Sequence, residues 1–235
     1  MKARALLQEG RVDEAIAALG VELRGDPTDI QRRTLLFELL CFAGEYDRAE
    51  KQLDILAGQG QQAAMGALVY RSAIHAERTR QRLFSEGDVP AAPPSAAVTG
   101  TLNGRPFSSI GDADPRIGGR LEAFVAGQYT LLPFAQLASV RMIAPRTLRD
   151  TLWPSAKVLA GPDFKDLELG EVIVPALAAG SSSAPDDAER LAPTPACYAD
   201  EAGRQFPLGQ KLLLIDGEEV PILEVRDLVF AAAGA

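Results

Sequence analysis

Gly10-Arg11-Val12-Asp13-Glu14-Ala15 recurs in altered form as Gly44-Glu45-Tyr46-Asp47-Arg48-Ala49, 34 residues further along the chain. A spacing of 34 residues is the period of the tetratricopeptide repeat, whose unit is a pair of antiparallel helices. In each stretch the glycine permits the turn between the two helices, and the alanine lets the helices approach closely. Pro27 ends the first unit, since proline is tolerated in the first turn of the next helix. The first part of the chain is therefore predicted to be a tetratricopeptide-like repeat.

The first 88 residues contain a single proline, and helices are predicted at residues 1–9, 12–24, 28–43, 46–57 and 61–84. A third repeat would place glycine at position 78 and an aromatic residue at position 80, but Arg78 and Arg80 stand there. Residues 61–84 are therefore predicted to form one long helix after two repeats. Because so short a solenoid has an open end, we expect the second half of the chain to cover it.

The composition changes near Gly87, and all the remaining prolines lie from Pro90 onward. Proline inside a helix removes a hydrogen bond and clashes with the preceding turn, so this half is predicted to contain strands, loops and short helices. Asp216-Gly217 and Ala126-Gly127 predict tight hairpin turns, and residues 180–185 predict a surface loop. Strands are predicted at residues 97–102, 121–132, 140–143, 157–160, 172–175, 211–215 and 220–225.

These patterns predict an α+β protein with two domains. A tetratricopeptide-like helical domain is expected at residues 1–88, followed by a Pro/Ala-rich linker at residues 89–97. A small α+β domain with a curled antiparallel sheet is expected at residues 98–235.

Composition excludes several classes of function. The formal net charge is −8, so the chain lacks the basic surface that binding to nucleic acid or to an anionic membrane requires. Cys41 and Cys197 lie far apart, which gives no disulfide framework and favours a reducing compartment. No run approaches the ~20 apolar residues of a membrane span. We therefore expect a cytoplasmic protein that binds neither nucleic acid nor membrane.

Asp112 and Asp114 are the strongest candidates for acid–base or metal chemistry, with Arg116 and Arg149 as candidate charge partners. Because Asp114 directly precedes Pro115, we favour a structural role in which its carboxylate caps a short helix. His75 is the single histidine, and without it Cys197 has no candidate base. We therefore predict no catalytic residue, no metal site and no cofactor.

Several spaced blocks carry a resemblance to a known family: Asn103-Gly104-Arg105-Pro106-Phe107, Asp112-Ala113-Asp114-Pro115-Arg116-Ile117-Gly118, Gly127-Gln128-Tyr129, Leu132-Pro133-Phe134, and Leu148-Arg149-Asp150 followed by Trp153. In this order they resemble the ImpE family, also called TagJ or HsiE, an accessory component of bacterial type VI secretion systems. The resemblance covers essentially the whole chain. Lys211 departs from it, because the family pattern leads us to expect arginine after Gly209-Gln210.

The resemblance implies a non-enzymatic cytosolic adaptor that binds the N-terminal segment of the small subunit of the contractile sheath. It also implies that this adaptor assists sheath assembly or recycling with the ClpV-type AAA+ unfoldase. From the residues alone, two alternatives stay open: a small-molecule hydrolase using the cluster of Asp112, Asp114, Arg116 and Arg149, and a general tetratricopeptide-type assembly chaperone.

Recognition of a peptide by such a fold uses either a groove that holds a helix or an open sheet edge that gains a strand. We favour a groove lined by the helical half, near the seam between the two domains. The residues predicted to bind the partner are Leu36, Leu40, Tyr46, Tyr70, Phe107, Tyr129, Arg149 and Trp153.

Overall fold

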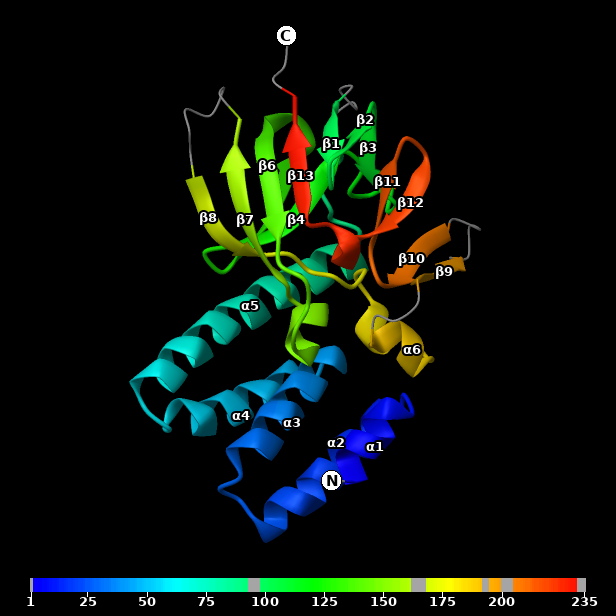
Figure 1. Ribbon diagram of the computed structural model, residues 1–235. Coiled ribbons are helices and arrows are strands. Elements are labelled where there is room, and N and C mark those ends of the chain that lie inside the picture. Colours follow the sequence, from blue (N-terminus) through cyan, green and yellow to red (C-terminus); the bar gives the residue numbers. More distant parts are fainter. Residues whose placement is uncertain (1, 93–97, 162–167, 192–194, 200–204, 232–235) are drawn as a thin grey trace.

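The computed structural model describes residues 2–92, 98–161, 168–191, 195–199 and 205–231. The first half consists of five helices: α1 (Lys2–Gln8), α2 (Val12–Gly25), α3 (Ile30–Phe42), α4 (Tyr46–Ala57) and α5 (Gln61–Glu86). Figure 1 shows α5 running beneath the sheet that the second half forms. Each predicted helix agrees with the observed one to within two residues at either end, so the helical prediction is confirmed.

The two repeats turn in the same way. Gly10 and Gly44 adopt left-handed conformations with φ of 76° and 71°. The residue after each glycine donates its backbone N–H to a carbonyl five residues back, at 2.9 Å to Leu6 and 2.8 Å to Leu40. This is the Schellman motif, which satisfies the last carbonyls of a helix and needs a residue that tolerates positive φ. The repeated glycine is thus explained by backbone geometry.

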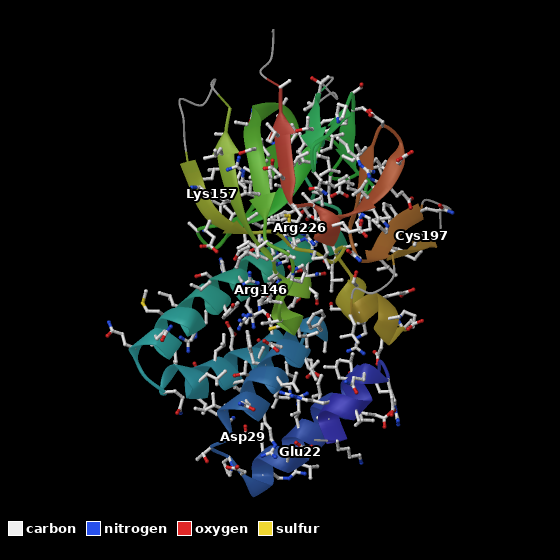
Figure 2. The ribbon with its side chains drawn as sticks, in the orientation of Figure 1. Glu22, Asp29, Arg146, Lys157, Cys197 and Arg226 are labelled. Carbon is white, nitrogen blue, oxygen red and sulfur yellow. The ribbon has the colours of Figure 1, made fainter. Side chains whose placement is uncertain are left out.

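Acidic side chains hold α2 against the start of α3. Asp29 precedes α3 and accepts the backbone N–H of Arg32 at 2.8 Å, which caps the helix. The Arg32 side chain donates to Asp29 at 2.7 Å and to Glu22 of α2 at 3.0 Å. Glu22 and Asp29 are labelled in Figure 2 at the end of the repeat that lies far from the sheet.

The second half is built from thirteen short strands in its described residues. They are β1 (Gly100–Leu102), β2 (Arg105–Phe107), β3 (Ile110–Asp112), β4 (Arg120–Val125), β5 (Gln128–Pro133), β6 (Leu137–Met142), β7 (Ser155–Ala160), β8 (Glu168–Ile173), β9 (Pro195–Ala199), β10 (Gln205–Gly209), β11 (Leu212–Ile215), β12 (Glu218–Pro221) and β13 (Asp227–Phe230). An eight-stranded antiparallel sheet has the order β2-β1-β13-β6-β7-β8-β4-β5. Beside it lie a three-stranded sheet, β12-β11-β3, and a two-stranded sheet, β10-β9 (Figure 1). The predicted α+β class is confirmed.

Three hairpins share one type of turn. Asp216-Gly217 and Ala126-Gly127 have two successive residues with positive φ, as a two-residue type I′ turn requires, so both predicted turns are confirmed. Asn103-Gly104 forms the third, between β1 and β2, although the sequence analysis predicted no turn there. The predicted strand at residues 220–225 is wrong in part, because it is interrupted by the 3-10 helix η5 (Ile222–Glu224) before β13 begins.

The two halves of the chain share a hydrophobic core. Phe124, Leu152, Trp153 and Leu177 of the second half pack among the buried residues of the helices. A second core lies within the sheet domain and contains Phe107 among other residues. Because α5 buries apolar residues against the second half, that half covers the end of the repeat, as expected from its short length.

Residues 174–178 run between the helices and the sheets without forming a helix. The N–H of Ala176 donates to the Leu152 carbonyl at 3.0 Å, and that of Ala178 to the Gly209 carbonyl at 2.9 Å. The surface loop predicted at residues 180–185 is wrong at its first part, because Ser181 begins a 3-10 helix, η4 (Ser181–Ser183), and is buried. The Ser181 hydroxyl bonds both the Ala178 carbonyl, at 2.7 Å, and the N–H of Gly209, at 2.9 Å.

The next helix, α6 (Asp187–Arg190), docks on the first repeat. Arg11 makes no side-chain cap for α2; instead the N–H of Val12 donates to the Asp187 carboxylate at 2.7 Å. Arg190 adds an ion pair to Asp13 at 3.0 Å. The second half therefore supplies the cap of a helix in the first half, so α2 is anchored at its N-terminus by a residue from far along the chain.

Candidate functional site

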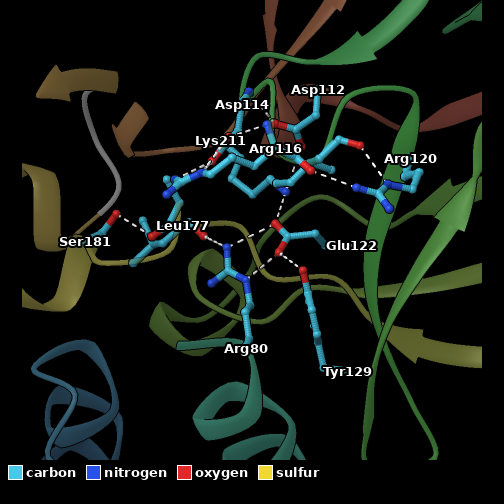
Figure 3. Close-up of polar contacts among 12 residues, drawn as sticks. Arg80, Asp112, Asp114, Arg116, Arg120, Glu122, Tyr129, Leu177, Ser181 and Lys211 are labelled. Atoms are coloured by element: carbon cyan, nitrogen blue, oxygen red, sulfur yellow. Dashed lines mark hydrogen bonds and ion pairs between the residues drawn. The ribbon is translucent and has the colours of Figure 1, made fainter. Parts of the chain in front are cut away.

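A buried cluster of charged side chains lies where α5 meets the sheets (Figure 3). Glu122 of β4 is 0% exposed and accepts two hydrogen bonds from Arg80 of α5, at 2.7 Å from Nε and 3.0 Å from Nη2. The hydroxyl of Tyr129 donates to the same carboxylate at 2.7 Å. The Lys211 ammonium group donates a further hydrogen bond to Oε2 of Glu122. Every oxygen of this buried acid is thus hydrogen-bonded, which a charge in a dry interior requires.

The cluster continues in both directions from Glu122. Arg80, itself 1% exposed, pairs with Glu77 at 3.0 Å and donates to the backbone carbonyl of Leu177 at 2.9 Å. On the other side, Lys211 pairs with Asp112 at 2.8 Å. Opposite charges therefore alternate from the long helix through β4 to β3, and Arg80 of the helical half contacts Glu122 and Leu177 of the second half.

The pKa values of the two acids that share Lys211 move in opposite directions. Burial alone would raise the pKa of Glu122, but Arg80 and Lys211 outweigh it and hold the pKa at about 2. Burial raises the pKa of Asp112 to about 6, even though Lys211 lowers it. At pH 7 both carboxylates are ionised and both are occupied with internal partners.

Asp114 and Arg116 form a turn beside this cluster. The N–H of Asp114 donates to Asp112 at 2.9 Å, and the Asp114 carboxylate accepts the N–H of Arg116 at 2.9 Å and its Nη2 at 2.6 Å. The Arg116 guanidinium lies over the rings of Phe84 and Phe206, 4.6 and 4.2 Å from their centroids. The expected short helix does not form after Asp114. The Asp114 carboxylate instead fixes a turn, because Arg116, two residues along the chain, supplies both a backbone and a side-chain donor.

Arg149 lies apart from Asp112, Asp114 and Arg116. It belongs to the 3-10 helix η2 (Leu148–Thr151), and its guanidinium stacks over the Tyr70 ring at 4.6 Å, with Glu38 at 3.9 Å. Among the described residues, no hydrogen bond or ion pair joins it to the two aspartates or to Arg116. The four-residue cluster of the hydrolase alternative is therefore divided, and the acids in it are bonded to basic side chains and backbone groups of the protein itself.

The remaining reactive side chains, those of His75, Cys41 and Cys197, belong to different elements of the fold. His75 lies on the outer side of α5, and Cys197 lies on β9 (Figure 2), while Cys41 is buried in the helical core. Within the residues that the structure describes, no group of three or more His, Cys, Asp or Glu is arranged to hold a metal ion. In the same residues, no helix is long and apolar enough to cross a membrane.

A groove of about 590 Å³ opens between the first half of α5 and the sheet. On the helix side, Leu68 and Val69 are 57% and 51% exposed, although both are large and apolar. Opposite them, the groove runs along the tip of the β4–β5 hairpin and the end of β8. Strands β4 and β8 are paired there through Phe124 and Ile173. The full lining is Leu68, Val69, Tyr70, Ser72, Ala73, Phe124, Ala126, Gly127, Asp150, Trp153, Ser155, Glu171, Val172 and Ile173.

Comparison with known proteins agrees with this architecture. A sequence model of the family described as "ImpE protein" matches residues 104–229, more than half of the chain. The chain belongs to the ImpE family. A tetratricopeptide repeat model matches residues 6–70, which supports the interpretation of the first half of this ImpE protein.

Two relatives of this ImpE protein cover nearly its full length. The type VI secretion system accessory component TagJ of Pseudomonas aeruginosa is 29% identical over 269 residues, which include 100% of this chain and 93% of the relative. A crystal structure of a protein from Vibrio parahaemolyticus has a TM-score of 0.83 at 21% identity, and the match covers 98% of both chains. The second likeness shows that the fold is shared.

The structure places the predicted partner-binding residues of this ImpE protein in three environments. Tyr70 and Trp153 line the groove, and Arg149 stacks on Tyr70 behind it. Tyr129 packs its ring against Phe124, 6.4 Å between centroids, while its hydroxyl is bound to the buried cluster. Three of the eight therefore lie at or directly behind the groove, and Tyr129 contacts one of the groove residues.

The other four predicted residues lie inside the protein or beside a small void. Leu36, Leu40 and Phe107 are buried in the two cores, where they contact the chain's own residues. Tyr46 lines a void of about 10 Å³, the space of about one water molecule. Leu36, Leu40 and Phe107 are buried and do not line the groove, so we leave them out of the proposed binding surface.

The sequence analysis missed the exposed large apolar residues of the groove. Leu68 and Val69 stand in the run Ala67-Leu68-Val69-Tyr70, where consecutive apolar residues exceed one buried face of a helix. That excess was a readable signal, since a helix with one covered face leaves such residues in solvent. Phe124 and Ile173 carried no comparable signal, because only the fold brings β4 and β8 together.

Proposed function

We propose that this ImpE-family protein is a non-enzymatic accessory adaptor of a bacterial type VI secretion system that acts in the cytoplasm. The full-length relationship to an accessory component of that system supports the proposal. The tetratricopeptide-like repeats support a role in binding another protein, since such repeats serve as scaffolds for binding surfaces. The candidate acids support a structural use, because their carboxylates are paired within the protein.

The partner in this proposal is the N-terminal segment of the small subunit of the contractile sheath, and its site is the groove. The observation that carries the proposal is the exposure of Leu68 and Val69 on one wall of a concave surface, because grouped exposed apolar side chains in a concavity are typical of binding sites. The Arg80–Glu122 pair joins α5 to β4, so it holds the two walls in a fixed relation. A prearranged groove lowers the entropic cost of binding a flexible segment.

The proposal includes a step beyond capture. By holding the sheath subunit, the adaptor assists sheath assembly or recycling together with the ClpV-type AAA+ unfoldase. The contribution of this protein is then binding alone, and the unfoldase supplies the mechanical work.

A calorimetric titration with a synthetic peptide from the N-terminus of the small sheath subunit tests the proposal. We expect a Kd below about 100 μM, which corresponds to about −5.5 kcal/mol. Val69→Ser should weaken binding about tenfold, since burying a valine side chain is worth about 1.5 kcal/mol or more. Val21→Ser on α2 is the matched control, because Val21 is 59% exposed but lies outside the groove lining. Absence of binding at that concentration, or equal effects of the two substitutions, would reject the proposal.

A further inference from the structure

The groove carries charge of one sign. Asp150 and Glu171 are the charged side chains in its lining, and no Lys, Arg or His lines it among the described residues. Lys157, which stands opposite Glu171 in the register of β7 and β8, lies outside the lining. A partner that enters this groove therefore meets two carboxylates on its wall, while the nearest arginine guanidinium named here, that of Arg149, is stacked on the Tyr70 ring behind it.

Asp150 is ionised and held in place by the backbone. Its Oδ2 accepts the N–H groups of Arg146 and Thr147, both at 3.0 Å, and the bond from Thr147 is one half of the capping box of η2. Burial alone would raise the pKa of Asp150, but these two N–H groups, with the Thr147 side chain and the charge of Arg149, lower it below its ordinary value. Glu171 is an exposed residue of β8. One acid of the groove is thus fixed by backbone hydrogen bonds, and the other is exposed on a strand.

The two walls differ in character. The α5 wall consists of Leu68, Val69, Tyr70, Ser72 and Ala73, which carry no charge. Both carboxylates come from the opposite wall, one from η2 and one from β8. An occupant that fits both walls has an apolar side and a positively charged side, because like charges placed at an interface are repelled and opposite charges guide association. The net charge of −8 acts in the same direction at longer range.

We infer that the groove binds an amphipathic segment that sets apolar side chains against α5 and at least one Lys or Arg side chain against Asp150 and Glu171. This inference rests on the proposed function, and it assigns the chemistry that the sheath segment must present. Basic side chains on the segment give specificity and a faster association, while the apolar contacts with Leu68 and Val69 give most of the affinity.

The test compares salt dependence and charge reversal in the same titration. The sheath-subunit peptide should bind the wild-type protein more weakly at 300 mM than at 50 mM NaCl, because exposed charge pairs are screened by salt. Glu171→Lys should weaken binding about threefold or more at low salt and reduce the salt dependence, and Glu171→Gln should fall between it and the wild type. Glu219→Lys on β12 is the matched control, since Glu219 is also an exposed strand residue but lies outside the groove lining. Circular dichroism confirms that each variant is folded.

The outcomes separate the two proposals. If the peptide binds the wild-type protein but the affinity is independent of salt and equal in Glu171→Lys and Glu219→Lys, the charge inference is wrong and the proposed function stands. Should the peptide fail to bind the wild-type protein, both are rejected. A second peptide, with its Lys and Arg residues replaced by glutamine, should bind the wild type as weakly as the original peptide binds Glu171→Lys.

Discussion

Replacing Arg80 by methionine is expected to destabilise the protein by about 3–5 kcal/mol, the usual cost of removing one partner from a buried ion pair. The size follows from what the guanidinium contacts. Its side chain is 1% exposed, and it donates to Glu122, Glu77 and the Leu177 carbonyl. Methionine fills most of the volume but leaves two acids short of a cation and one carbonyl without its donor.

Trp153 provides the assay, because it is the single tryptophan and is buried in the core shared by the helices and the sheet domain. Its fluorescence in a urea titration, followed beside circular dichroism at 222 nm, reports on the seam and on the helices separately. The two signals should coincide in the wild type if the halves unfold as one unit. Arg82→Met, an exposed position on the same helix, is the control and should change stability by less than about 0.5 kcal/mol.

A double-variant cycle sharpens the result. Glu122→Gln removes the charge that Arg80→Met would strand, so the double variant should be less destabilised than the sum of the two single variants. A loss of less than about 1 kcal/mol for Arg80→Met, where a stranded buried charge should cost several times more, would contradict the reasoning. So would strict additivity in the cycle.

Three further predictions follow from particular contacts. Gly44→Ala should lower the melting temperature of the protein more than Gly10→Ala does. Both glycines have positive φ, but of the two only Gly44 would bring an added Cβ against another side chain, Ser182 Oγ at 2.9 Å. Equal decreases in melting temperature would show that this contact is unimportant. The pKa of Asp112 in the folded state is about 6, above the ordinary value, so the folded state binds a proton at Asp112 at a higher pH than the unfolded state does. As the pH falls from 7 to 5, the free energy of unfolding of the wild type should therefore rise by about 1 kcal/mol relative to that of Asp112→Asn in urea titrations. A constant difference across that range would contradict the assignment. Asp187→Ala should cost about 1 kcal/mol and speed hydrogen exchange at the start of α2, whose first N–H the carboxylate accepts; unchanged exchange there would refute the cap.

The helical half could be predicted closely from the sequence because its information is local. Gly10 and Gly44 mark the same turn 34 residues apart, and Pro27 separates the units. The strands were less accessible, because strand pairing joins residues far apart: β1 pairs with β13, at the other end of the domain. The turn at Asn103-Gly104 is the exception, since its dipeptide is a strong local hairpin signal that could have been used.

The candidate site shows where sequence reasoning ends. Arg80 was recognised as a departure from the repeat, yet its role as a buried cation between the two halves of the chain depends on Glu122, whose position only the fold reveals. Lys211 was likewise noted as a departure from the family pattern, and it proves to bridge Asp112 and Glu122. Asp112 and Asp114 were expected to be structural, and their carboxylates are bonded inside the protein, although in a turn and an ion pair instead of a helix cap.

The bond between Val12 and Asp187 has a consequence for biosynthesis. The two residues are 175 positions apart, so the acceptor for the first N–H of α2 leaves the ribosome long after the helix itself. During that interval the nascent repeat lacks this cap, and until the residues that cover α5 have been made and folded it exposes apolar surface of the kind that chaperones bind. Completion of the helical solenoid thus awaits the final third of translation, and truncated chains ending before residue 187 should be prone to aggregation.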